Sequence, residues 1–316
     1  MNQLPFCRKG SLLTGHYFNN RISIIQNRME TVQPKAILLI HCPDQSGIVA
    51  SVTQFISKYN GNILDLDQHV DKHANIFFMR VAWELNSFGL AEDALRDAFS
   101  SGIAKPYNMT WNLHITRKKQ RMAVFVSKQS HCLFDILARF ESGEWEVDIP
   151  LIISNHTELE TVANRLNIDF HHVSVTKTNK VTAEQRQREL LQRYNIDFIV
   201  LARYMQILSE DFVNDFPSRI INIHHSFLPA FPGAKPYHSA YERGVKLIGA
   251  TSHYVTAELD QGPIIEQDVI HVNHKHSIDD LVRKGRDLEK VVLSRAIWSH
   301  LHRKTLVFKN RTVIFQ

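Results

Sequence analysis

Residues 198–229, FIVLARYMQILSEDFVNDFPSRIINIHHSFLP, contain the pattern that decides the fold of most of this chain. Two apolar runs, Phe198–Ala202 and Ile220–His224, are short and bounded by polar residues, so both are predicted to be buried strands. Between them, Ser209 stands where the N-cap of a helix is expected. Buried strands joined through helical segments are typical of a parallel α/β sheet.

The same pattern continues on both sides of this segment. Further strands are predicted at Met122–Val126, Val147–Ile153, 249–255 and 262–270, and helices at 130–141, 157–166, 183–194 and 277–303. A C-terminal hairpin is predicted from strands at 306–308 and 313–315. Residues 121–316 are therefore predicted to form an α/β domain with a mostly parallel, Rossmann-like sheet and helices on both faces.

Residues 34–116 follow a different pattern. Strands are predicted at 36–41, 63–70, 74–83 and 107–115, and helices at 48–59 and 91–101. The resulting order β-α-β-β-α-β is that of a ferredoxin-like α+β unit. Such a small unit often binds a small ligand or pairs with a copy of itself. A polar segment at 117–120 joins it to the larger domain.

The composition excludes several classes of protein. A chain of 316 residues with 44% hydrophobic and 22% charged residues is typical of a globular protein of two domains. No apolar run approaches the length of a membrane span. Three widely spaced cysteines, Cys7, Cys42 and Cys132, argue against a disulfide framework and indicate a reducing, cytoplasmic location. The net charge of +5, with no interleaved basic and aromatic residues, does not favour nucleic-acid binding.

The N-terminal extension, residues 1–33, is predicted to be disordered. Its first 29 residues include arginine and lysine but no acidic residue, and they lack the apolar core of a secretory signal. A translation start at Met29 is an alternative, and an organelle transit peptide is less favoured.

Asn222 and His224 are the first candidates for chemistry. Because side chains alternate along a strand, the two project from the same face of the predicted strand. They lie at its carboxyl end, where open α/β sheets bind ligands. His225 and Ser226 follow directly, and together with His253 they are candidates for lining the same pocket.

A carboxylate and an apolar loop complete the candidate site. Asp260 is predicted in a loop after the polar strand that contains His253, and Gly262 lets the backbone approach a ligand there. A carboxylate in this place can orient an imidazole and stabilise its charge. The loop Met205–Leu208, which follows a buried strand, has exposed backbone groups and apolar side chains that suit a flat heterocycle.

Residues 121–305 resemble the formyl-transfer enzymes that use 10-formyltetrahydrofolate. The resemblance rests on Asn222-Ile223-His224, Ser226-x-Leu228-Pro229, Ala202-x-x-Met205-x-Ile207-Leu208, and Val255 through Asp260-x-Gly262-Pro263. The N-terminal unit looks like an ACT domain. This combination is similar to that of the formyltetrahydrofolate deformylases, and it covers all of the chain except the N-terminal extension.

The resemblance implies hydrolysis of 10-formyltetrahydrofolate, with water as the second substrate and no cofactor. It also implies a supply of formate for purine synthesis. Asn222 would donate to the developing oxyanion, and His224 would add a second interaction or a proton. Asp260 would hold His224 and help to position or deprotonate the water. The folate would be bound by Met205, Gln206, Ile207, Leu208, Val255 and Glu258.

The chain departs from the transferases of this family in two places. Glycinamide ribonucleotide formyltransferases carry a glycine-rich phosphate loop after the first strand, whereas Val126–Leu133 contains no glycine, although Lys128 remains to attract phosphate. Gln206 replaces an arginine beside the pterin. No nucleic-acid-binding domain like that of the methionyl-tRNA formyltransferases is expected after residue 305. Hydrolysis is therefore favoured, and transfer to an unidentified amine stays open.

The ACT resemblance implies regulation. The residues that match an amino-acid site between paired ACT domains are Asp44, Gln45, Ser46, Gly47, Asn62 and Ile63. Methionine or glycine is the implied effector, and a dimer or tetramer is expected because the exposed edge of the sheet invites a partner strand. Purely structural pairing of the two domains stays open.

Two further alternatives are weaker. A non-enzymatic amino-acid sensor would not need Asn222, His224 and Asp260. A metal hydrolase would need ligands such as His271, His274 and His276, but their spacing is not a standard zinc pattern. No metal site is therefore expected.

Overall fold

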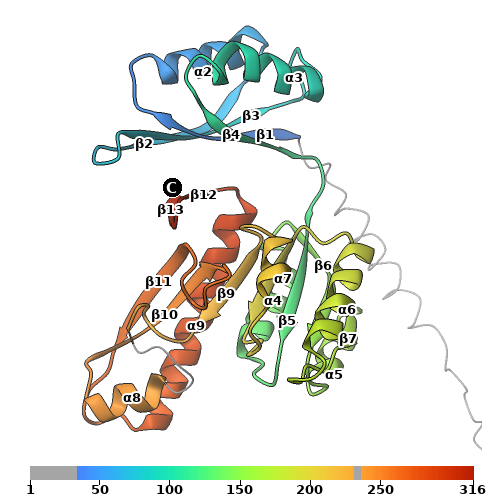
Figure 1. Ribbon diagram of the computed structural model, residues 1–316, viewed down its shortest axis with the longest axis vertical. Coiled ribbons are helices and arrows are strands. Elements are labelled where there is room, and N and C mark those ends of the chain that lie inside the picture. The colour runs from blue at the N-terminus through green and yellow to red at the C-terminus, as the bar shows by residue number, and fades with distance from the viewer. Residues whose placement is uncertain (1–33, 231–235) are drawn as a thin grey trace, which may run out of the picture.

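The computed structural model describes residues 34–230 and 236–316, and the predicted extension at 1–33 lies outside them. The smaller N-terminal domain lies above the larger one in Figure 1. No helix among the described residues is long and apolar enough to span a membrane.

The smaller domain is an antiparallel sheet of four strands with two helices on one face (Figure 1). Its elements are β1 (Lys35–Pro43), α2 (Ile48–Lys58), β2 (Ile63–Asp71), β3 (Ile76–Glu84), α3 (Glu92–Phe99) and β4 (Thr110–Thr116). The strand order β2-β3-β1-β4 is that of a ferredoxin-like unit. Alternate residues of β3, from Phe77 to Trp83, are buried in the core, as the sequence pattern predicts.

The end of this domain differs from its prediction in two details. The helix expected to stop at Gly102 continues as one π-helical turn, η1 (Ser100–Ala104). The last strand begins at Thr110, because Tyr107 turns inward and its hydroxyl lies 2.7 Å from Ser51 Oγ. Side-chain alternation alone predicted a longer strand.

The larger domain is built on a sheet of seven strands in the order β11-β10-β9-β8-β5-β6-β7. The strands are β5 (Gln120–Val126), β6 (Val147–Ser154), β7 (Asp169–His172), β8 (Phe198–Ala202), β9 (Ile220–His224), β10 (Leu247–Tyr254) and β11 (Ile264–His271). The helices are α4 (His131–Ser142), α5 (Glu160–Arg165), α6 (Lys180–Arg193), α7 (Glu210–Asn214), α8 (Pro236–Arg243) and α9 (Ile278–Leu301). The apolar strands β5, β6 and β8 lie in the centre of the sheet, between two clusters of buried side chains.

Five neighbouring strands, β7 to β9, are parallel, whereas β10 and β11 are antiparallel to their neighbours. The chain runs outward from β5 to β6 and β7 and then returns to β8 on the other side of β5. The carboxyl ends of β5 and β8 therefore form the switch point at which open α/β sheets bind ligands.

The mostly parallel sheet is confirmed, and two short elements were not predicted. Strand β7 is a polar edge strand of four residues, so it has no apolar run to reveal it. Helix α8 is also short, and its sequence PYHSAYER begins with proline and is mostly polar.

The C-terminal hairpin links the two domains. It consists of β12 (Thr305–Phe308) and β13 (Arg311–Ile314), and its apolar side chains pack with Leu39 and Phe78 of the smaller domain. The buried Arg80 of β3 donates hydrogen bonds to the carbonyls of His302 and Arg303, which follow the C-terminus of α9. The open face of the small sheet is thus attached to the longest helix of the larger domain.

Candidate active site

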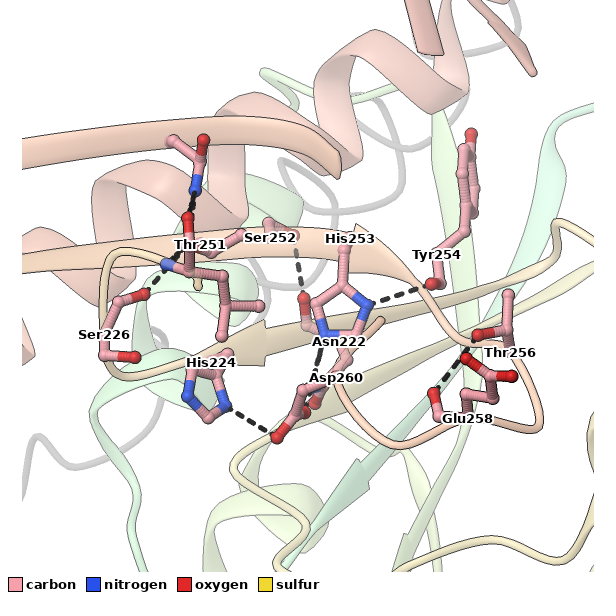
Figure 2. Close-up of polar contacts among 12 residues, drawn as sticks. Asn222, His224, Ser226, Thr251, Ser252, His253, Tyr254, Thr256, Glu258 and Asp260 are labelled. Carbon is pink, nitrogen blue, oxygen red and sulfur yellow. Dashed lines mark hydrogen bonds and ion pairs between the residues drawn. The ribbon is translucent and has the colours of Figure 1, made fainter. Parts of the chain in front are cut away.

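The ends of β9 and β10 bring the predicted polar residues together. The two strands are antiparallel, and their register places His253 opposite Asn222 and Thr251 opposite His224. His224 and His253 are buried, and Asn222 is partly buried. The loop after β10 then returns, so that Asp260 faces both histidines (Figure 2).

Asp260 fixes the orientation of His224. Its Oδ2 atom lies 3.2 Å from His224 Nδ1, and a carboxylate oxygen can only accept, so Nδ1 carries the proton. In the neutral ring, His224 Nε2 is therefore an acceptor. This atom is buried and has no hydrogen-bond partner among the described residues. Because buried polar groups are normally satisfied, His224 Nε2 is the group that most clearly requires a ligand or water.

His253 orients Asn222. Its Nδ1 atom lies 2.9 Å from the carbonyl oxygen of Tyr254, which requires a proton on Nδ1. Its Nε2 atom lies 3.2 Å from Asn222 Nδ2, so a neutral His253 accepts one amide hydrogen of Asn222. The second amide hydrogen of Asn222 stays available to a substrate oxygen. The sequence indicated His253 only as a pocket residue, whereas the structure makes it a bridge between Asn222 and Asp260, whose Oδ1 lies 3.7 Å from Nε2.

The carboxyl group of Asp260 is held in its charged form. The hydrogen bond from His224, followed by the influence of the nearby His253 ring, holds its pKa well below the usual range, against an opposing effect of burial. Asp260 is therefore suited to stabilise a positive imidazolium, and it is a weak base.

Gly262 is required by the backbone. A Cβ atom at this position would lie 1.7 Å from the carbonyl oxygen of Tyr254. The close approach that the structure shows at Gly262 is therefore to the end of β10, and the expected contact of its backbone with a ligand stays a prediction. This contact, together with the positive φ of 56° at Asp260, sets the course of the loop.

We expect the substitution Gly262→Ala to lower the free energy of unfolding by about 2–3 kcal/mol, because the loop has to move away from Tyr254. Urea denaturation measures this change. Gly102→Ala is the matched control, since a Cβ atom there meets nothing within 4 Å. Equal stabilities of the two variants would contradict the account.

The predicted folate-binding residues lie on two loops. Met205 and Ile207, in the loop after β8, are 54% and 60% exposed. Gln206 and Leu208 are partly buried. In the loop after β10, Val255 packs against the core and Glu258 is exposed. Leu259 is 59% exposed and was not predicted, although it is an apolar residue beside Asp260. Exposed apolar side chains on both loops form surfaces that a flat ligand can cover.

His225 and Ser226 are both buried beside the site. The ring of His225 packs against those of His224 and Tyr237, at centroid distances of 5.1 and 6.0 Å. Ser226 accepts a hydrogen bond from Thr251 through its carbonyl oxygen (Figure 2). Both residues line a mainly apolar cavity of about 350 Å³ next to α8 and β10. They therefore form part of the wall of this cavity beside the site.

One set of close potential metal ligands exists among the described residues, and it consists of His131, Cys132 and Glu289. The carboxylate of Glu289 already accepts from His131 and Tyr237 and lies 3.5 Å from the Arg203 guanidinium. Burial raises the pKa of the Cys132 thiol, so it stays protonated. This chemistry does not fit a cation. His271, His274 and His276 do not converge on a common site.

The predicted regulatory residues do not come together within one chain. Asp44 to Gly47 precede α2, and Gly47 is its N-cap with a φ of 89°, whereas Asn62 and Ile63 follow the other end of the helix. Eleven residues of α-helix span about 16 Å. A site made from both groups would therefore need two copies of the chain.

Comparison with known proteins identifies the family. A family model described as formyl transferase matches residues 120–297, and an ACT domain model matches 36–99. The chain is 55% identical over 280 residues to a formyltetrahydrofolate deformylase of Synechocystis, covering 89% of this chain and 98% of that protein. The chain belongs to the formyltetrahydrofolate deformylase family.

Two further deformylases agree with this assignment. The Bacillus subtilis formyltetrahydrofolate deformylase is 46% identical over 90% of this chain and 94% of its own length. The crystal structure of a formyltetrahydrofolate deformylase from Pseudomonas syringae superposes with a TM-score of 0.87, at 43% identity, and covers 94% of this chain and 100% of that one. The prediction of an ACT domain followed by a formyltransferase domain is confirmed.

Proposed function

We propose that this chain hydrolyses 10-formyltetrahydrofolate to formate and tetrahydrofolate. The curated deformylases align with it over nearly their whole length, at 43–55% identity. The observation that carries the mechanism is the buried Nε2 atom of His224, which has no partner within residues 34–230 and 236–316 and whose other ring nitrogen is held by Asp260.

The orientations of the Asn222 amide, the His224 ring and the Asp260 carboxylate support the following reaction. The free amide hydrogen of Asn222 stabilises the oxyanion that forms as water attacks the formyl carbon. His224 Nε2 accepts the proton of that water, and Asp260 stabilises the resulting imidazolium. The proton then passes to N10 as the carbon–nitrogen bond breaks. The carbon–oxygen bond forms when water attacks, and the oxyanion regains its double bond as N10 leaves as the amine of tetrahydrofolate. The resulting formic acid loses its remaining acidic proton to solvent and becomes formate.

Water is favoured as the acceptor by the contacts after β5. Ser127 donates its hydroxyl hydrogen to the carbonyl of Tyr204 and lies 2.6 Å from Asn155 Oδ1. The ammonium of Lys128, which is the predicted group for attracting a phosphate, lies 3.4 Å from a carboxylate oxygen of Glu158. Ser127 is thus held by Tyr204 and Asn155, and the charge of the exposed Lys128 is partly offset by Glu158, so this segment favours water over a phosphorylated amine as the acceptor.

We further propose that no metal takes part. Oxyanion stabilisation by Asn222 and proton transfer by His224 account for each step of the hydrolysis. We expect dialysis against a chelator to leave kcat within about twofold of the untreated enzyme. A loss of activity that is restored by a divalent cation would contradict this.

Asp260 should contribute to the decrease in the free energy of unfolding at acidic pH. Its folded pKa lies below the unfolded value of about 3.9, so its contribution is present above about pH 5 and is lost as the pH falls toward the folded pKa. We expect Asp260→Asn to be less stable than the wild type by a constant amount from about pH 5 to 8, and by less below about pH 4. Denaturation at a series of pH values measures this difference. An increase on acidification would contradict it.

The direct test of function is release of formate from 10-formyltetrahydrofolate without an added acceptor. We expect formate and tetrahydrofolate in equal amounts. If the folate binds but turns over only when an amine is supplied, the enzyme is a transferase.

Regulation forms a second part of the proposal. The ACT domain supports an amino-acid effector, methionine or glycine, bound between the ACT domains of two copies of the chain. The separation of Gly47 from Asn62 along α2 supports a site shared between copies. Release of formate would then supply purine synthesis and balance one-carbon pools.

A further inference from the structure

The loop 203–209, between β8 and α7, combines exposed apolar side chains with a strained backbone. Met205 and Ile207 point away from the core. Arg203 and Met205 both adopt positive φ values, 63° and 55°, which are unfavourable for residues with a side chain. Such a loop keeps its shape only if its surroundings hold it.

Buried polar side chains hold this loop at both ends. At the far end, Glu184 of α6 accepts hydrogen bonds from the backbone N–H of Ser209, at 2.8 Å, and from its hydroxyl. At the near end, the guanidinium of Arg203 lies 3.5 Å from Glu289 of α9. Glu184 and Glu289 are 5% and 1% exposed.

A third anchor holds the part of the loop next to Arg203. Gln187, also on α6, donates a hydrogen bond of 2.7 Å to the hydroxyl of Tyr204 and is fully buried. Ser127 donates to the carbonyl oxygen of the same tyrosine. Met205 and Ile207 thus lie between fixed points that come from α6, α9 and the segment after β5.

Burial of these polar side chains lowers the free energy of unfolding of the protein. Burying a carboxylate removes its hydration, and apolar replacements of buried ion pairs are often neutral or stabilising. Burial raises the pKa of Glu289, but hydrogen bonds from His131 and Tyr237 and the charge of Arg203 outweigh it, so the group stays ionised. Several buried polar groups directed at one exposed loop indicate a role in setting its shape.

We propose that Glu184, Gln187 and Glu289 are positioning residues for substrate binding, which hold the loop 203–209 in the form that receives the folate ring system. The inference rests on the proposed function for the identity of the ligand. Preorganisation lowers the entropy lost on binding, so its removal weakens binding more than it slows the chemical step.

The test compares variants with matched controls on the same helices. Glu184→Gln and Glu289→Gln remove the buried charges, whereas Glu189→Gln on α6 and Asp287→Asn on α9 remove exposed ones. We expect the two buried variants to raise KM, and the Kd of tetrahydrofolate measured by calorimetry, by about fivefold or more, with kcat within about threefold. The two controls should match the wild type.

A triple variant, Arg203→Met, Tyr237→Phe and Glu289→Met, separates positioning from folding. It removes the buried ion pair without leaving a lone charge, and it also removes the buried hydroxyl that would lose its acceptor, so we expect its melting temperature to stay near that of the wild type. Its KM should remain raised. Folded variants with unchanged KM and unchanged Kd would overturn the proposal, and so would a loss of kcat at constant KM. If the wild type binds tetrahydrofolate but releases no formate, the proposed function fails while the Kd values still test the loop.

Discussion

Substitution of Asp260 by asparagine is expected to lower kcat by a factor on the order of 10²–10⁴, which is the usual contribution of a general acid–base pair. The amide has nearly the same shape, and its oxygen can still accept from His224 Nδ1, 3.2 Å away in the wild type. The negative charge that stabilises the imidazolium is lost. Steady-state formate release measures the effect, and KM should change little because the folate is held mainly by other groups.

The control for this prediction is Asp268→Asn. Asp268 lies on the edge strand β11 and pairs with Arg295 at the surface. The same chemical change there should leave kcat unaltered. If Asp260→Asn retains full activity at a wild-type melting temperature, Asp260 has no part in the reaction.

Substitution of Asn222 by alanine is expected to cause the second large decrease in kcat. Removal of one preorganised oxyanion donor costs about 10²–10³ in kcat. The loss should appear in kcat because the hydrogen bond is strongest when negative charge develops on the formyl oxygen. Single-turnover kinetics separates this step from product release.

Asn222→Ala also removes the hydrogen bond to His253, so a second comparison is needed. His253→Ala deprives Asn222 of its orienting partner but leaves the donor in place, and we expect a smaller loss than for Asn222→Ala. Asn164→Ala, at an exposed position on α5, controls for the loss of an amide. A larger loss of kcat from His253→Ala than from Asn222→Ala would show that His253, and not Asn222, makes the main contribution to the reaction.

The fold and the convergence of Asn222, His224 and Asp260 could largely be predicted, for physical reasons. Central strands such as Phe198–Ala202 are buried on both faces, so each is a short, continuous apolar run. Alternation along β9 placed Asn222 and His224 on one face, and the structure confirms that Asp260, which was predicted to hold His224, lies beside it. These features depend on neighbours in sequence, which a single sequence displays.

Contacts between distant segments could not be predicted in the same way. Glu184 and Glu289 lie on helices whose other acidic residues are exposed or partly exposed, so a polar side chain there indicates a solvated face. Their partners, Ser209 and Arg203, lie 25 and 86 positions away along the chain (209 − 184 and 289 − 203). Likewise, the role of Gly262 depends on the carbonyl of Tyr254, whose position follows only from the folded loop.

Attack by water at the formyl carbon is the central step of the proposed hydrolysis, and oxygen-18-labelled water tests that step most directly. The enzyme would be given 10-formyltetrahydrofolate in labelled water without an amine, and the formate would be analysed by mass spectrometry. We expect one labelled oxygen in each formate released, together with an equal amount of tetrahydrofolate. The release of formate should be greatly slowed in Asn222→Ala. Formate without label, or turnover that requires an added amine, would contradict the proposed hydrolysis.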